Sequence, residues 1–323
     1  MTIQAPPSLS KERSWRQAAR DGDVERLSID TIRTLAMDMV EALAWGHAGA
    51  PMVLAPLAYV LFTRYLKHDP ADPDWADRDR FVLTAGHPER GVTPGVASTG
   101  PLGQSIANAV GMALTEHLLA ARFNRPGHEI IDHRTWVIAS DGDLMEGVGG
   151  EACSLAGHLG LGKLVVFYDD NRITGEGCST PLAFSESVGR RFEAYGWQVL
   201  TVGDVNDADS LAWAIETARG DVVRPSLVVV RSTIACEVPT KQGTATARGM
   251  PLGPSEIDAA KKQLGCPYRQ PFVAPAVVRM AMDRVRARAE RRREEWDVEL
   301  LRYQQDRPDL AAELERVLAD VRT

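Results

Sequence analysis

The sequence predicts an α/β fold, a parallel sheet flanked by helices on both faces, with a helical extension at the C-terminus. Two observations lead to this fold class. From Thr135 onward, short uninterrupted apolar runs alternate with helical patterns, as expected for strands that are buried on both faces. From about Ala274 to the end, a charged helical pattern continues without any strand-like run.

The first third of the chain has mainly helical character. Residues up to about Arg26 are polar, and we expect a loose arm there, followed by a helix from Ser28, its N-cap, to Trp45. Residues 46–51 interrupt that pattern before a second apolar helix, which we expect to end near Leu66. A Pro- and Asp-rich loop (69–79), a turn-rich segment (86–103) and a helix (102–123) follow.

The middle of the chain carries the alternation that defines the sheet. Strands are predicted at 135–139, 164–167, 198–202 and 226–231, and helices at 145–159, 185–195 and 207–218. Strands that are separated by helices pair in parallel, with the helices covering both faces. We therefore divide the chain into a polar arm (1–27), a main domain (28–270) and a helical tail (271–323) that breaks near Pro308.

Composition limits the classes of partner. The 323 residues carry a net charge of −7, so the chain has no general attraction for nucleic acid or anionic lipid, and a small-molecule substrate is expected. The basic run 284–293 is interrupted by glutamates and is interpreted as a solvated helix face. The spacings of the four cysteines match neither a zinc site nor a redox-active cysteine pair. No apolar run is long enough to span a membrane, and the N-terminus lacks the apolar stretch of a secretory signal. A cytoplasmic protein is expected.

Two polar segments each follow a predicted buried strand. The first runs from Ser140 to Gly147 and contains Asp141 and Gly142, and the second ends at Asn171. Since ligands of open parallel sheets bind beyond the carboxyl ends of the strands, we expect Asp141 and Asn171 to lie side by side. A carboxylate and an amide oxygen suit Mg²⁺, which is usually held together with phosphate oxygens. Gly142 allows the backbone to approach a diphosphate closely.

The order Asp-Gly, helix, strand, Asp-Asn resembles the thiamine diphosphate signature, and the surrounding residues narrow it to the transketolase family. The motifs that carry the resemblance are His47–Met52 with the preceding Gly46, Gly86–Glu89, Thr99–Gln104, Ala107–Met112, Asp141–Gly147, Ser154–Gly157, Leu161–Leu164, Phe167–Asn171 and Pro251–Gly253. The resemblance extends from about Ser28 to the end of the chain.

The resemblance implies a set of roles. Asp141, Asn171 and the Ile173 carbonyl match positions that bind Mg²⁺, and Gly142 matches one that contacts the cofactor diphosphate. Family members cleave a two-carbon ketol unit from a ketose phosphate and pass it to an aldose. The other matched positions are Gly100 and Leu102 beside the aminopyrimidine ring, Ile234 against the cofactor, Glu146 near a dimer contact, and His47 and His87 as histidines that handle substrate groups.

The chain departs from the family in three places. It stops before the domain that supplies the cofactor-activating glutamate, so we expect a separately encoded pyrimidine-binding partner and a heterotetramer. Residues 81–90 contain one Gly-His step where the family has two, and which role His87 keeps stays open. Arg248 stands where the family has a histidine; it either holds a diphosphate or an acidic donor, or faces solvent.

Three functions therefore stay open. The first is the diphosphate-binding subunit of a heteromeric transketolase that acts on sugar phosphates. The second is a thiamine diphosphate subunit that uses a 2-oxo acid donor, which the lost histidines and Arg248 would suit. The third is a non-catalytic remnant, or the product of a truncated or decayed gene.

Overall fold

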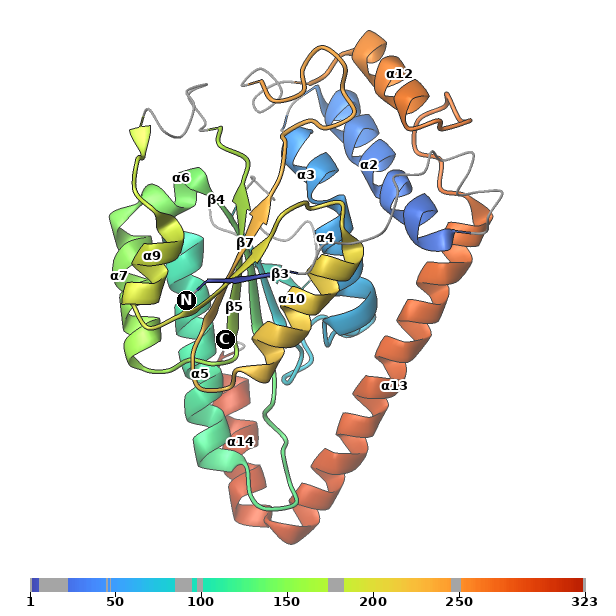
Figure 1. Ribbon diagram of the computed structural model, residues 1–323. Coiled ribbons are helices and arrows are strands. Elements are labelled where there is room, and N and C mark those ends of the chain that lie inside the picture. Colours follow the sequence, from blue (N-terminus) through green and yellow to red (C-terminus); the bar gives the residue numbers. More distant parts are fainter. Residues whose placement is uncertain are drawn as a thin grey trace.

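A computed structural model describes residues 2–5, 23–44, 46, 48–84, 95–97, 101–173, 183–244 and 251–321. Within these ranges, seven strands form one sheet in the order β1-β6-β7-β5-β4-β2-β3, and every pairing is parallel (Figure 1). The strands are β1 (Ile3–Gln4), β2 (Arg80–Leu83), β3 (Val96–Ala97), β4 (Thr135–Ser140), β5 (Leu164–Asp170), β6 (Gln198–Val202) and β7 (Ser226–Arg231).

Helices cover both faces of the sheet, as the sequence predicts (Figure 1). One face packs against α5 (Gln104–Phe123), α7 (Gly147–His158) and α9 (Val188–Ala194), and the other against α4 (Ala55–Val60), η1 (Leu61–Tyr65) and α10 (Ala208–Gly220). Alternate residues of one strand enter the two cores: Val166 and Tyr168 lie in the first, and Val165 and Phe167 in the second. The fold class and the four central strands are confirmed.

The described residues near the N-terminus (2–5 and 23–27) differ from the expected loose arm. Residues 3 and 4 form β1 at the sheet edge, and α2 (Val24–Leu43) begins before Ser28. Asp23 is the N-cap, because its carboxylate accepts a hydrogen bond from the backbone amide of Arg26 at 3.0 Å. Ser28 was wrongly predicted as the cap: its hydroxyl lies inside the helix and donates to the Val24 carbonyl at 2.7 Å.

Two further helices form an outer layer with α2. They are α3 (Gly49–Val53) and α12 (Pro254–Gln263), and the sequence did not predict α12. A buried ion pair links this layer, since Lys261 on α12 donates to both carboxylate oxygens of Asp38 on α2, at 2.7 and 3.0 Å. This layer flanks the same end of the sheet as the carboxyl ends of the strands (Figure 1).

The tail forms a helical hairpin. The long helix α13 (Ala276–Asp306) runs away from α2, the chain turns at Arg307, and α14 (Pro308–Val321) returns alongside α5 (Figure 1). Tyr303 is fully buried there, and its hydroxyl donates to the Phe123 carbonyl at 2.8 Å. The tail therefore lies outside the sheet but packs against α5, one of the helices that cover the sheet.

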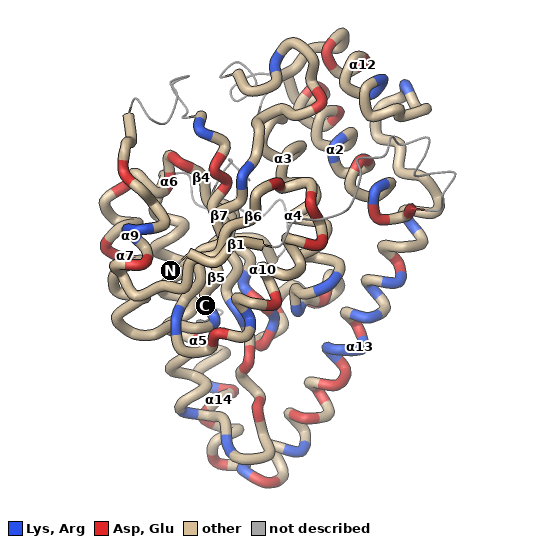
Figure 2. Tube along the Cα trace, in the orientation of Figure 1, with Lys and Arg blue, Asp and Glu red and all other residues tan. Residues whose placement is uncertain are grey.

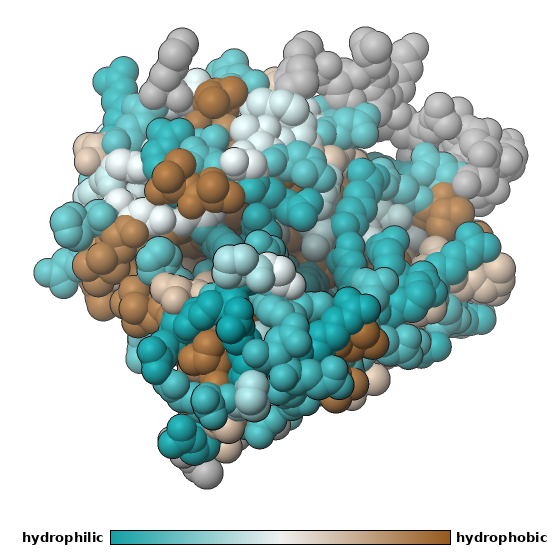
Figure 3. All heavy atoms as spheres, turned by 90° about the horizontal axis from the view of Figure 1, so that it is seen from below, coloured by the Kyte–Doolittle hydropathy of each residue, from teal (hydrophilic) through white to brown (hydrophobic). Residues whose placement is uncertain are grey.

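The basic run of α13 is only partly solvated. Arg293 lies over the rings of Trp75 and Trp296, at 5.7 and 5.1 Å, and forms an ion pair with Asp72 at 2.9 Å. The interpretation as a wholly solvated face is wrong at this residue, because the helix packs against the 69–79 loop. Elsewhere, basic and acidic residues are interspersed along α13 and α14 (Figure 2), and this end of the molecule is largely hydrophilic (Figure 3).

No helix in the described ranges has both the length and the apolar character needed to cross a membrane.

Candidate cofactor site

The carboxyl ends of β4 and β5 bring the two predicted metal-binding segments together. The strands are in register from Thr135 opposite Leu164 to Ser140 opposite Asp169. Asp141 and Asn171 therefore follow neighbouring strand ends, and both are buried, at 0% and 8% exposure. The expected adjacency is present, because parallel pairing aligns the two ends and each strand is followed by a turn.

Asp141 is the first residue of α6 (Asp141–Met145), a short helix that begins directly at the strand end. Asp143 anchors this turn, because one of its carboxylate oxygens accepts from both the amide and the hydroxyl of Ser140 at 2.9 Å. The Tyr168 hydroxyl donates to Asp141 Oδ1 at 2.5 Å. Burial, followed by the Asp141 charge, raises the pKa of the Tyr168 phenol far above its usual value, so the phenol remains a donor.

Asn171 is held by hydrogen bonds on both sides of its amide group. Its Nδ2 donates to Asp169 Oδ2 at 2.7 Å, and its Oδ1 accepts from the backbone amide of Ile173 at 2.9 Å. Asp169 also accepts from the hydroxyl of Ser232, which follows β7. Arg172, between the two predicted ligands, has a positive φ of 61°, and this places the chain in a tight turn at the strand end.

Glycine allows α5, α6 and α7 to meet closely beside Asp141. Gly103 has a φ of +73°, and a Cβ there would lie 2.5 Å from Cβ of Glu146. Leu102 covers Gly142, since a Cβ on Gly142 would meet Leu102 Cδ1 at 3.4 Å. The structure therefore groups Leu102, Gly142 and Glu146 near Asp141, and the contacts of these residues with a cofactor stay predictions.

The other predicted residues are less completely placed. Ile234 follows β7, is 1% exposed, and its carbonyl accepts from the Gly243 amide at 2.9 Å. His47, His87, Gly100 and Arg248 lie outside the described residues. Conversely, no role was predicted for Tyr168, Asp169 or Ser232. Tyr168 and Asp169 belong to the motif that led to Asn171, but the contacts of Tyr168 with Asp141 and of Asp169 with Ser232 depend on which strands are neighbours.

The residues at the strand ends fit Mg²⁺ bound together with a diphosphate. Asp141 contributes a buried carboxylate, Asn171 an amide oxygen and Ile173 a carbonyl, which is a hard, all-oxygen donor set. A set with one carboxylate leaves positions for phosphate oxygens. Among the described residues no group of three or more His, Cys, Asp or Glu side chains could hold a metal ion. A cation at this edge would therefore need amide, carbonyl and ligand oxygens in addition to the single carboxylate of Asp141.

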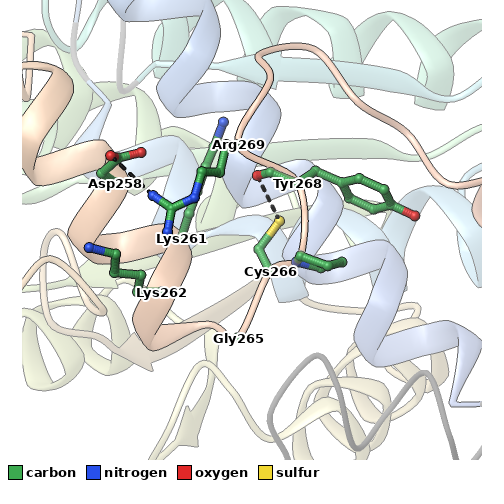
Figure 4. A pocket seen from close by; sticks show the side chains of 8 residues that line it. Asp258, Lys261, Lys262, Gly265, Cys266, Tyr268 and Arg269 are labelled. Atoms are coloured by element: carbon green, nitrogen blue, oxygen red, sulfur yellow. Dashed lines mark hydrogen bonds and ion pairs between the residues drawn. The ribbon is translucent and has the colours of Figure 1, made fainter.

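Two polar cavities lie at the carboxyl ends of the strands, one beside β5 and the other beside β6 and β7. One of about 550 Å³ is lined by Tyr168, Asp170 and the 184–190 segment, and one of about 530 Å³ by Ser232, Thr233 and the 203–206 turn. A third, of about 320 Å³, lies between α12 and the 265–269 turn and contains none of the predicted site residues (Figure 4). Its Lys261 and Arg269 are already paired with carboxylates.

Comparison with known proteins gives matches over most of the chain. Residues 24–87 and 83–322 match the family model described as "Transketolase, thiamine diphosphate binding domain". The transketolase of Geobacillus stearothermophilus is 44% identical over 334 aligned positions, which cover 91% of this chain and 49% of that protein. A transketolase of Aliivibrio fischeri is likewise 44% identical over 322 positions. The chain thus spans about half the length of the curated relatives that it matches.

Solved structures give the same result. A Pichia stipitis transketolase in complex with sedoheptulose 7-phosphate has a TM-score of 0.88 and 38% identity, over 92% of this chain and 49% of that one. The Campylobacter jejuni transketolase has a TM-score of 0.80 and 33% identity, over 86% of this chain and 48% of that one.

The alignments also indicate an internal gap. The two family-model segments overlap at residues 83–87. For the Geobacillus protein, 91% of 323 residues is about 294, so about 40 of the 334 aligned positions have no residue in this chain.

Proposed function

The chain belongs to the transketolase family of thiamine diphosphate binding domains, and from this membership we propose that it is the diphosphate-binding subunit of a heteromeric transketolase. The observation that carries the proposal is the pair of buried oxygen ligands, Asp141 and Asn171, at adjoining parallel strand ends. With Ile173 they would hold Mg²⁺, while Gly142 would contact the diphosphate. Leu102, Ile234, Gly100, Glu146 and Arg248 would complete the cofactor surroundings.

The cofactor, when bound, would supply the electron sink for cleavage of a ketose next to its carbonyl group. The protein's own contribution would be binding, orientation and proton transfer. His47 and His87 are the proposed groups for moving protons at substrate hydroxyl and carbonyl oxygens. Leu102, which lies over Gly142 and is 44% exposed, would provide an apolar wall at the cofactor's edge.

A separate partner chain is part of the proposal, because the chain covers only about half of each relative. The partner would contribute the pyrimidine-binding half, and a heterotetramer is the proposed assembly. Co-expression with candidate pyrimidine-binding halves, followed by mass measurement of the purified complex, tests this. A chain that neither co-purifies with such a half nor gains thiamine diphosphate binding in its presence would contradict the proposal and support the non-catalytic remnant.

The donor needs a direct test, because two places in the chain favour a second candidate reaction. The overlap at residues 83–87 coincides with the shortened Gly-His segment around His87, and Arg248 replaces a histidine. These changes favour a 2-oxo acid donor as the alternative, since arginine pairs with carboxylates and does not act as a base near neutral pH. Turnover of ketose phosphates by the assembled complex supports the transketolase reaction. Turnover of pyruvate but not of ketose phosphates would overturn the transketolase reaction in favour of the 2-oxo acid donor.

A further inference from the structure

The proposed metal ligands are held in place by a second layer of hydrogen bonds. The layer consists of Tyr168 and Asp169, two consecutive residues of β5, and of Ser232, which follows β7. Because side chains alternate along a strand, Tyr168 lies on the face covered by α5, α7 and α9, and Asp169 on the opposite face. The two residues therefore support the strand-end edge from both sides of the sheet.

Asp169 fixes which way the Asn171 amide points. An ionised carboxylate only accepts hydrogen bonds, so Asn171 must present its Nδ2 to Asp169 Oδ2, as the 2.7 Å contact shows. The amide oxygen then faces the other way, toward the Ile173 amide at 2.9 Å. A carbonyl oxygen has two acceptor sites, so this contact leaves capacity for a cation. Ser232 donates to the second oxygen of Asp169 and holds the carboxylate itself.

Tyr168 performs the corresponding task for Asp141. Its ring is 4% exposed and packed in the core, so the hydroxyl position is set by rigid surroundings. The hydroxyl donates to Asp141 Oδ1, which fixes the rotation of that carboxylate. A carboxylate offers about four lone-pair sites, so accepting this hydrogen bond is compatible with also binding a cation.

We propose that Tyr168 and Asp169 are positioning residues that orient the two side-chain ligands of the magnesium–diphosphate site before the metal arrives. The inference rests on the proposed cofactor site and adds to it two residues that need not touch the metal. Outer-layer partners of metal ligands typically change metal affinity by about 10- to 100-fold when they are removed. We expect effects of this size from Tyr168→Phe and from Asp169→Asn.

The test is a Mn²⁺ titration of the full-length chain, alone and with a co-purified pyrimidine-binding half, at thiamine diphosphate equimolar with protein. Protein-bound Mn²⁺ is measured by electron paramagnetic resonance as the loss of free Mn²⁺ beyond that in a protein-free control with the same thiamine diphosphate. Tyr168→Phe and Asp169→Asn should weaken binding about 10- to 100-fold. Tyr195→Phe is the matched control for loss of a tyrosine hydroxyl on the same face of the sheet. Asp170→Asn is the control for loss of charge, because Asp170 pairs with Arg231 rather than with Asn171. Both controls should bind Mn²⁺ nearly as wild type does.

A metal-free measurement separates this inference from the cofactor proposal. The Ile173 amide donates to Asn171, so Asp169→Asn should accelerate its hydrogen exchange in the chain without metal, and Asp170→Asn should not. If wild type binds no Mn²⁺ either alone or with a co-purified pyrimidine-binding half, the cofactor site is wrong, and the exchange rates still decide whether Asp169 positions Asn171. Equal weakening by Asp169→Asn and Asp170→Asn, or unchanged exchange in Asp169→Asn, would overturn the positioning role.

Discussion

The packing of α7 predicts that alanine substitutions at two of its glycines change the stability of the chain in opposite directions. A Cβ on Gly157 would lie 1.8 Å from the Tyr195 carbonyl oxygen and 2.9 Å from its carbon, both of them backbone atoms. On Gly150, the nearest contact of a Cβ would be the Tyr195 hydroxyl at 3.6 Å, an ordinary van der Waals distance. Alanine should therefore fit at Gly150 and not at Gly157.

The magnitudes follow from these distances. Glycine to alanine within a helix gains roughly 0.5–1 kcal/mol when there is space, so Gly150→Ala should stabilise the chain by about that amount. At Gly157 the backbone of the 195–197 turn must move by more than 1 Å to reach the 3.0–3.4 Å at which contacts are already tight. Such overpacking costs about 3 kcal/mol or more, which exceeds the helix gain.

The assay is equilibrium unfolding in urea for wild type and both variants, with thermal melting as a second measurement. We expect Gly157→Ala to melt several degrees below wild type, at about 2 °C per kcal/mol for a chain of this size. Gly150→Ala should melt at or above wild type. The reasoning is refuted if Gly157→Ala is as stable as Gly150→Ala.

Three other substitutions test packing and charge. Lys261→Met leaves the buried carboxylate of Asp38 without its ammonium partner. It should lower the free energy of unfolding, measured in urea, by about 3–5 kcal/mol, and a loss below about 1 kcal/mol would contradict a buried ion pair. Burial lowers the pKa of His133 in the folded state from 6.5, so protonation favours unfolding, and the stability gained from neutral His133 is lost as the pH falls below about 6.5. The wild-type free energy of unfolding should then fall more steeply with acid than that of His133→Asn, and parallel curves would disprove it. Arg293→Gln should lower the free energy of unfolding by about 1 kcal/mol, because it removes the contacts with the two tryptophan rings, while exposed Arg291→Gln should be neutral. Equal effects of the two substitutions in urea unfolding would show that Arg293 is as solvated as the rest of the basic run.

The central strands were predictable because each is an uninterrupted apolar run bounded by polar or turn-forming residues. β4 and β5 are buried along nearly their whole length, and this burial produces the sequence signal directly. β2 has only four residues, of which the central two are buried, and it precedes a glycine-rich segment, so periodicity alone does not distinguish it from a loop. β1 and β3 have two residues each and depend on pairing with a neighbouring strand rather than on their own pattern.

The site shows the same division. Asp141 and Asn171 were predicted from their positions after strands, because parallel pairing makes carboxyl ends coincide. Ser232 lies 63 residues from Asp169 in sequence, and only the order of the strands brings them together. The N-cap error at Ser28 has a similar origin, since Asp23 and Ser28 are both good caps and packing of α2 decides between them.

The two consecutive aspartates of β5 lie on opposite faces of the sheet, so an odd and an even change in the length of this strand have different consequences. Asp169 contacts Asn171 and Ser232 on one face, and Asp170 pairs with Arg231 on the other. Loss or gain of one residue within β5 would exchange their faces, giving the carboxylate of one to the surroundings of the other. A change of two residues would preserve the alternation. Among related chains, strand β5 should therefore vary in length by even numbers before it varies by odd ones.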